Sequence, residues 1–104
     1  MDYKTLLGYM EDTQVQIICR TREQRAEAVD ILKELNPDLD TTFISQKYEP
    51  SEFPSMGYDG MRDEWALWRN WDSGKLMTVE TLRELVNNHA DEIELACGSL
   101  EDVL

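Results

Sequence analysis

The sequence predicts an α+β domain built as a two-layer sandwich of the split βαβ type. The prediction rests on two apolar periodicities, strand-like alternation and helical spacing, and on the order in which they follow each other along the chain. Strand patterns cover residues 14–20, 41–48, 64–71 and 92–97, and helix patterns cover residues 22–35 and 79–89. The resulting order is strand, helix, strand, strand, helix, strand. It predicts one sheet with both helices on one face and a bare opposite face.

This βαββαβ order is ferredoxin-like, with two additions. An extra N-terminal segment follows Asp2, a good capping residue, and apolar residues recur in it at helical spacing: Tyr3, Leu6, Leu7 and Met10. A long loop at residues 49–60, marked by Pro50, Pro54 and Gly57, separates the second and third strands. Its apolar residues either fold back over the core or belong to a contact site: Phe53, Met56 and Tyr58.

The first strand and the first helix carry the clearest signals. Alternation in the strand gives it one apolar face, which should meet the helices: Val15, Ile17 and Cys19. Thr21 followed by Gln24 has the spacing of a capping box, so a helix should begin at this point. Asn36 and Pro37 should end that helix, because the residue before a proline disfavours helical geometry.

The remaining elements are less regular. Residues 41–48 alternate weakly, as an edge strand does, whereas residues 64–71 carry large side chains on both faces, as a central strand does. Thr78 should cap the second helix. Residues 92–97 alternate and are predicted as a strand, although a helix that runs on to a Gly98 cap is the alternative.

Length and charge limit the function. A chain of 104 residues predicts a single domain, 1–104. Its formal net charge of −12 repels phosphate backbones, so direct nucleic-acid binding is not expected. The sequence shows neither a targeting segment nor an apolar run long enough to span a bilayer, which predicts a cytoplasmic protein without a membrane partner. Cys19 and Cys97 are predicted to be free thiols, because the topology places them at opposite edges of the sheet.

The sequence carries no enzyme signature, and we expect a non-enzymatic protein without a cofactor or a metal. His89 is the only histidine, and no Ser or Cys nucleophile lies at a catalytic spacing from it. The run from His89 to Glu92 lacks the second histidine or the thiolate pair of a transition-metal site. Glu64 beside Trp65 is the best candidate for acid–base chemistry, but such chemistry needs a pocket that shifts a carboxyl pKa.

The uncovered face of the predicted sheet is the first candidate site. It would hold aromatic and basic residues in an otherwise acidic chain: Phe43, Trp65, Arg69 and Trp71. Trp and Arg are enriched among interface anchors, so the predicted function is binding of another protein through this face, with a homodimer as one form of it. The alternative is that the long loop or the N-terminal segment covers these residues.

The acidic C-terminal end is the second candidate site. Residues 84–104 hold six acidic residues and no Lys or Arg, and among them Asp91, Glu92 and Glu94 are candidate contacts for a basic surface. Clustered carboxylates also suit DNA mimicry, in which an acidic inhibitor fills the basic groove of a nucleic-acid-handling enzyme, as viral anti-defence and phage accessory proteins do. Two further interpretations stay open: an acidic end that only keeps the protein soluble, and a small-molecule-sensing regulatory domain.

Overall fold

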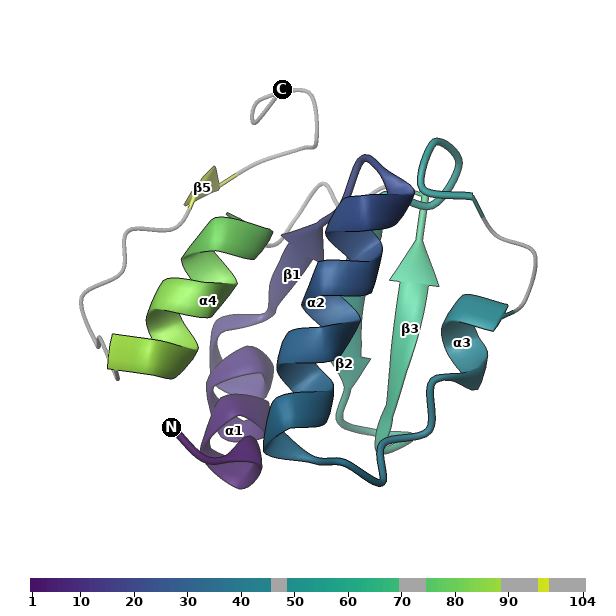
Figure 1. Ribbon diagram of the computed structural model, residues 1–104. Coiled ribbons are helices and arrows are strands. Elements are labelled where there is room, and N and C mark those ends of the chain that lie inside the picture. Colours follow the sequence, from purple (N-terminus) through teal and green to yellow (C-terminus); the bar gives the residue numbers. More distant parts are fainter. Residues whose placement is uncertain (46–48, 70–74, 89–95, 98–104) are drawn as a thin grey trace.

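A computed structural model describes residues 1–45, 49–69, 75–88 and 96–97 (Figure 1). Its helices are α1 (Tyr3–Thr13), α2 (Arg22–Leu35), α3 (Thr42–Ser45) and α4 (Val79–Asn88). Its strands are β1 (Val15–Ile18), β2 (Ser55–Asp59), β3 (Glu64–Trp68), β4 (Lys75–Thr78) and β5 (Ala96–Cys97). The predicted α+β class is confirmed, because helices pack on a mixed sheet.

The strands form one sheet in the order β3-β2-β1-β4-β5. β1 pairs in parallel with β4, whereas the other neighbouring pairs are antiparallel. The predicted ferredoxin-like order is not confirmed. β2 lies inside the predicted loop, and β4 has only four residues, too few to show an alternation of its own. Neither strand is among the elements that the sequence predicts.

The predicted strand at residues 41–48 is wrong over Thr42–Ser45, which form the short helix α3. Asp40 explains the difference, because its Oδ1 accepts a hydrogen bond from the Thr42 amide at 2.9 Å and another from the Thr42 hydroxyl. This local side-chain cap turns the chain into a helical conformation and outweighs the weak alternation that follows it. Residues 46–48 lie outside the described residues.

The predicted loop at residues 49–60 is wrong from Ser55 onward, where β2 pairs with β3 over five positions. β2 and β3 form a hairpin whose turn begins at Gly60, directly after Asp59 pairs with Glu64. Of the apolar residues in this segment, Met56 is fully buried, and Tyr58 packs against the core. Met56 and Tyr58 therefore pack against the core from a strand of the sheet and not from a loop folded over it.

Residues 49–54 are held against the start of α2. The Cys19 amide donates to the Pro54 carbonyl at 2.7 Å, the Arg25 guanidinium donates to the Phe53 carbonyl, and Arg22 forms an ion pair with Glu49. These bonds lead the chain into β2 beside β1. Cys19 is a buried free thiol, and the side chain of Cys97 lies outside the description.

The predicted helix starts are confirmed. Asp2 accepts from the Thr5 amide at 2.8 Å at the start of α1, and Thr78 accepts from the Thr81 amide at 3.1 Å at the start of α4. Thr21 caps α2, while the Gln24 side chain returns to the Arg20 amide instead of the Thr21 amide, so the capping box is shifted by one residue.

The end of the chain is described only in part. α4 ends at Asn88, and β5 consists of Ala96 and Cys97, which agrees with the last two residues of the predicted strand at 92–97. His89 and residues 92–95 lie outside the description, so the predicted ends of these two elements stay predictions. Within the described residues, no helix is long and apolar enough to cross a bilayer.

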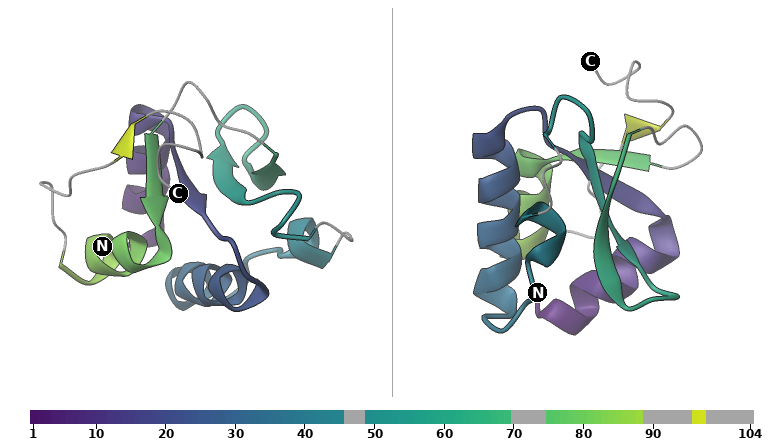
Figure 2. Two further views of the ribbon diagram at one scale, coloured as in Figure 1. Left: turned by 90° about the horizontal axis from the view of Figure 1, so that it is seen from above. Right: turned by 90° about the vertical axis from the view of Figure 1, so that its right-hand side faces the viewer.

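The two long helices α2 and α4 lie side by side on one face of the sheet, as both views of Figure 2 show. Strand register aligns Ile17, Met56 and Leu67 in a row across that face. Buried side chains from the helices complete this core: Ala28, Ile31 and Leu32 of α2, Leu82 and Leu85 of α4, and Leu6 and Met10 of α1. The predicted inner face of the first strand is confirmed, because Val15 and Ile17 of β1 and Cys19 directly after it lie in the core.

The predicted bare face is wrong at two strands. The sequence predicts Trp65 there, but Trp65 faces the helices with Leu67 and is only 4% exposed, whereas Trp68 lies on the opposite face. On β1, Gln16 and Ile18 belong to that opposite face, yet they are 3% and 5% exposed. The face therefore cannot serve at these positions as the open recognition surface that the sequence predicts.

Candidate functional site

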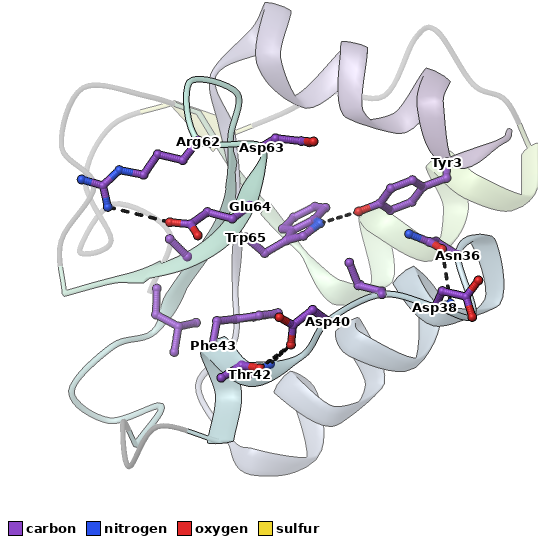
Figure 3. A pocket seen from close by; sticks show the side chains of 13 residues that line it. Tyr3, Asn36, Asp38, Asp40, Thr42, Phe43, Arg62, Asp63, Glu64 and Trp65 are labelled. Carbon is purple, nitrogen blue, oxygen red and sulfur yellow. Dashed lines mark hydrogen bonds and ion pairs between the residues drawn. The ribbon is translucent and has the colours of Figure 1, made fainter.

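A cleft of about 690 Å³ lies between β3 and the connection from α2 to α3 (Figure 3). Residues 62–67 form one wall, residues within 36–43 form the other, and Tyr3 of α1 contributes from a third element. The cleft exists because β3 is the last strand of the sheet on this side, and α3 packs next to it. Its volume falls within the usual range of ligand sites, about 300–1,000 Å³.

Trp65 forms the fixed part of this cleft. Its indole Nε1 donates a hydrogen bond to the Tyr3 hydroxyl at 2.9 Å, which ties β3 to α1. On the sheet, the Tyr58 ring stands opposite, with ring centroids 5.8 Å apart and a tilt of 56°. Contacts on both sides leave the indole ring little rotational freedom, so the centre of the cleft is rigid.

Apolar side chains line the cleft beside Trp65. Leu39, Phe43 and Leu67 are partly buried and pack against the core, so each leaves an apolar portion turned to the cleft. Phe43 comes from α3, while Leu67 comes from β3. The two walls thus present an apolar strip between them.

The rim of the cleft is acidic. Four carboxylates line it against one guanidinium, a formal balance of −3: Asp38, Asp40, Asp63 and Glu64, with Arg62. The hydrogen bonds from Thr42 to Asp40 lower the pKa of that carboxyl, which secures its charge at neutral pH. Figure 3 shows that the carboxylates of Asp40 and Glu64 come from opposite walls.

Arg62, the cation among the described residues that line the cleft, is weakly held. It lies 3.8 Å from Glu64 and 3.9 Å from Asp59, and its side chain is 75% exposed. Exposed ion pairs of this length are screened by solvent and contribute little to stability. Glu64 is therefore available to a cation from another molecule.

Asp63 is occupied within the chain. It accepts a hydrogen bond of 2.5 Å from the Tyr58 hydroxyl, and this bond raises the pKa of Tyr58 to about 12. Asp63 also has a positive φ of 52°, a turn conformation that Asp tolerates better than most residues. Its carboxylate supports the hairpin turn and adds charge to the rim.

The structure separates the predicted contact residues. It brings Phe43 and Trp65 together at the cleft, on a helix and in the core rather than on one open sheet face. Arg69 is exposed and lies over the Phe53 ring, 5.0 Å from its centroid, away from the cleft. The other predicted contacts lie outside the described residues: Trp71, Asp91, Glu92 and Glu94.

Most of the rim is missing from the sites that the sequence predicts. Asp38 and Asp40 follow the predicted end of a helix and are not among the predicted contacts, and neither is Asp63. Acidic residues in two turns are visible in the sequence, but only the strand order shows that these turns flank the same sheet edge. Glu64 and Trp65, which the sequence analysis names together as a candidate for acid–base chemistry, both line the cleft.

The shape and charge of the cleft carry the functional inference. Comparison with known proteins found no matching family model, no matching curated protein and no matching solved structure. Among the described residues, no three side chains of His, Cys, Asp or Glu gather in the way that a metal site needs. What the cleft can bind is therefore judged from its own residues.

Proposed function

We propose that this chain is a small non-enzymatic binding module that holds a basic segment of a partner protein in the acidic cleft. One observation carries the proposal: a cleft of about 690 Å³ joins an apolar strip to a rim with four carboxylates and one guanidinium. That combination is complementary to Lys and Arg side chains, which have an apolar stem and a cationic head.

Each part of the cleft has a place in this proposal. The stem of a partner Lys or Arg would lie along Phe43 and Leu67, and its head would reach the carboxylates of Asp38 or Glu64. Trp65 supplies a rigid base, so little side-chain entropy is lost when the partner binds. The overall charge of −12 would also speed the encounter with a basic partner.

The proposal is tested with a short peptide of alternating Lys and Val and a cleft variant that combines Asp38→Asn with Glu64→Gln. We expect the variant to bind the peptide at least about fivefold more weakly, because two charge contacts are lost. The control combines Glu23→Gln with Glu84→Gln, which removes the same charge from exposed positions outside the cleft.

The control should stay within about twofold of the unmodified protein, since distant exposed charges are screened by salt. Equal losses in the cleft variant and the control would refute the proposal and leave only non-specific attraction. A polyamine such as spermine serves as a second probe. If spermine binds and the Lys and Val peptide does not, the cleft is a small-molecule site instead.

DNA mimicry is a second candidate, and α2 offers an observation in its favour. Exposed carboxylates recur along that helix at positions that share one face: Glu23, Glu27, Asp30 and Glu34. Arg83 pairs with Glu34 at 2.7 Å and offsets part of this charge. Mimicry predicts the opposite result for binding to a DNA-binding protein. The control variant with Glu23→Gln and Glu84→Gln would bind that partner more weakly, and the cleft variant would not.

A further inference from the structure

The outer edge of β3 lies open in the cleft. β3 is the terminal strand of the order β3-β2-β1-β4-β5, so it pairs with β2 on one side only. In an antiparallel pair, alternate residues direct their amide and carbonyl groups away from the partner strand. β3 therefore carries outward backbone groups on the side that faces α3.

These outward groups have no backbone partner within the part of the chain that the structure describes. Near β3, the backbone hydrogen bond outside the strands joins the Arg62 amide to the Asp59 carbonyl in the turn. No such bond among the described residues involves the four residues at the edge: Glu64, Trp65, Ala66 and Leu67. The same four residues line the cleft. An unpaired edge of this kind is a template for another strand.

The dimensions suit an added strand. Four edge residues at about 3.4 Å each give a length of roughly 14 Å, and a neighbouring strand would lie about 4.8 Å away. The facing wall, residues 36–43, belongs to the connection and to α3; because α3 itself packs against β3, an added strand would lie between β3 and the connection. The cleft therefore extends along the edge of β3 and is not confined to one residue of it.

We propose that the partner segment binds in extended form and adds a strand to the outer edge of β3. Its backbone pairs with the outward groups of residues 64–67, and its basic side chains reach the carboxylates of Asp38, Asp40 and Glu64. Strand addition of this kind takes affinity from main-chain hydrogen bonds and specificity from alternate side chains. This inference rests on the proposed function and names how that partner is held.

Charge selects the basic partner over a second copy of this chain. Two β3 edges brought together would place acidic rims opposite each other, each with Asp38, Asp40 and Glu64, and like charges opposite one another destabilise a sheet pair. The chain as a whole carries −12. Charged residues at a strand edge are also a common protection against self-association.

The test uses two N-methylated forms of the Lys and Val peptide, one methylated at every Lys and the other at every Val. Methylation removes amide donors along one edge of the peptide strand and keeps every side chain. If the peptide pairs with β3, one form should lose at least about tenfold in affinity, and the other should stay within about threefold, because only one edge faces β3.

Equal effects of the two methylations, whether both forms bind or both fail, would overturn strand addition. The proposed function would survive that result if the affinity still depended on Asp38 and Glu64, so the two failures are distinguishable. Sedimentation of the free protein adds a second check. A stable dimer that dissociates into monomers when the peptide is added would assign the β3 edge to a second copy of the chain and overturn the inference.

Discussion

The indole nitrogen of Trp65 donates a hydrogen bond of 2.9 Å to the hydroxyl of Tyr3, 62 positions earlier in the sequence. The bond fastens α1 to β3, the strand at the edge of the sheet. Since Trp65 is 4% exposed, its N–H has little access to water when Tyr3 is lost. The geometry of the cleft therefore depends on a contact between the N-terminal helix and the edge strand.

Tyr3→Phe should lower the free energy of unfolding by about 1–2 kcal/mol, because it leaves a mostly buried donor without a partner. Denaturant unfolding measures the loss. In a Trp65→Phe background the same substitution should cost clearly less, because no indole donor is then left unpaired. Equal costs in the two backgrounds would show that the hydrogen bond has no role in stability.

Gly57 and Gly8 form a matched pair for the packing of β2. A Cβ at Gly57 would lie 2.8 Å from Cδ of Gln16, whose side chain is buried and bonded to Ser55, whereas a Cβ at Gly8 meets nothing within 4 Å. Gly57→Ala should lower the free energy of unfolding by about 1–3 kcal/mol, because the buried amide of Gln16 must move.

Gly8→Ala should instead raise the free energy of unfolding by about 0.5–1 kcal/mol, because it replaces a glycine within a helix. Thermal unfolding would detect both changes. A neutral Gly57→Ala would mean that Gln16 relaxes freely.

Local signals explain which parts of the fold were predictable from sequence. The capping residues Asp2, Thr21 and Thr78 act within their own helices, so sequence spacing identified all three helix starts. Gly57 sits inside β2 because Gln16 of β1 fills the space that a side chain would need. That reason is a contact between distant segments, whereas the sequence near Gly57 shows only a glycine that follows Pro50 and Pro54, a pattern that is typical of a loop.

The cleft was less predictable for the same reason. The pairing of β1 with β4 is parallel and joins residues about sixty positions apart, and it leaves β3 at the edge of the sheet. Large residues on both faces of β3 gave no sign in the sequence of which face meets the helices, whereas the structure buries Trp65 against Tyr3 and Tyr58. Unless β3 is known to be the edge strand, nothing in the sequence indicates that Asp38 and Glu64 lie near the same cleft.

Tyr58 should make stability fall at alkaline pH. Its pKa is raised to about 12 by the hydrogen bond to Asp63, so the folded state holds its proton more tightly than the unfolded chain, where the ordinary value is 10.0. The contribution is complete below about pH 10 and is lost as the pH rises toward 12. Urea unfolding of Tyr58→Phe should show a smaller fall across this window. A fall as steep as that of the unmodified protein would contradict the assignment.

Cys19 should be inert in the folded protein. Burial raises the pKa of its thiol to about 12, and the side chain is fully buried. In a Cys97→Ser background, an aromatic disulfide reagent at about pH 8 should therefore react only after the protein is unfolded, because the thiolate is the reactive form. Rapid reaction under native conditions would show that the first strand and α2 open more readily than their packing indicates.

The most direct measurement is an NMR titration of the labelled protein with the Lys and Val peptide, because it locates the binding surface residue by residue. The proposed function predicts that amide shifts change at residues 36–43 and 62–67, and that the indole N–H of Trp65, a residue that lines the cleft, shifts as well. Changes confined to the acidic face of α2, with Glu23, Glu27 and Asp30, would contradict it and place the partner elsewhere.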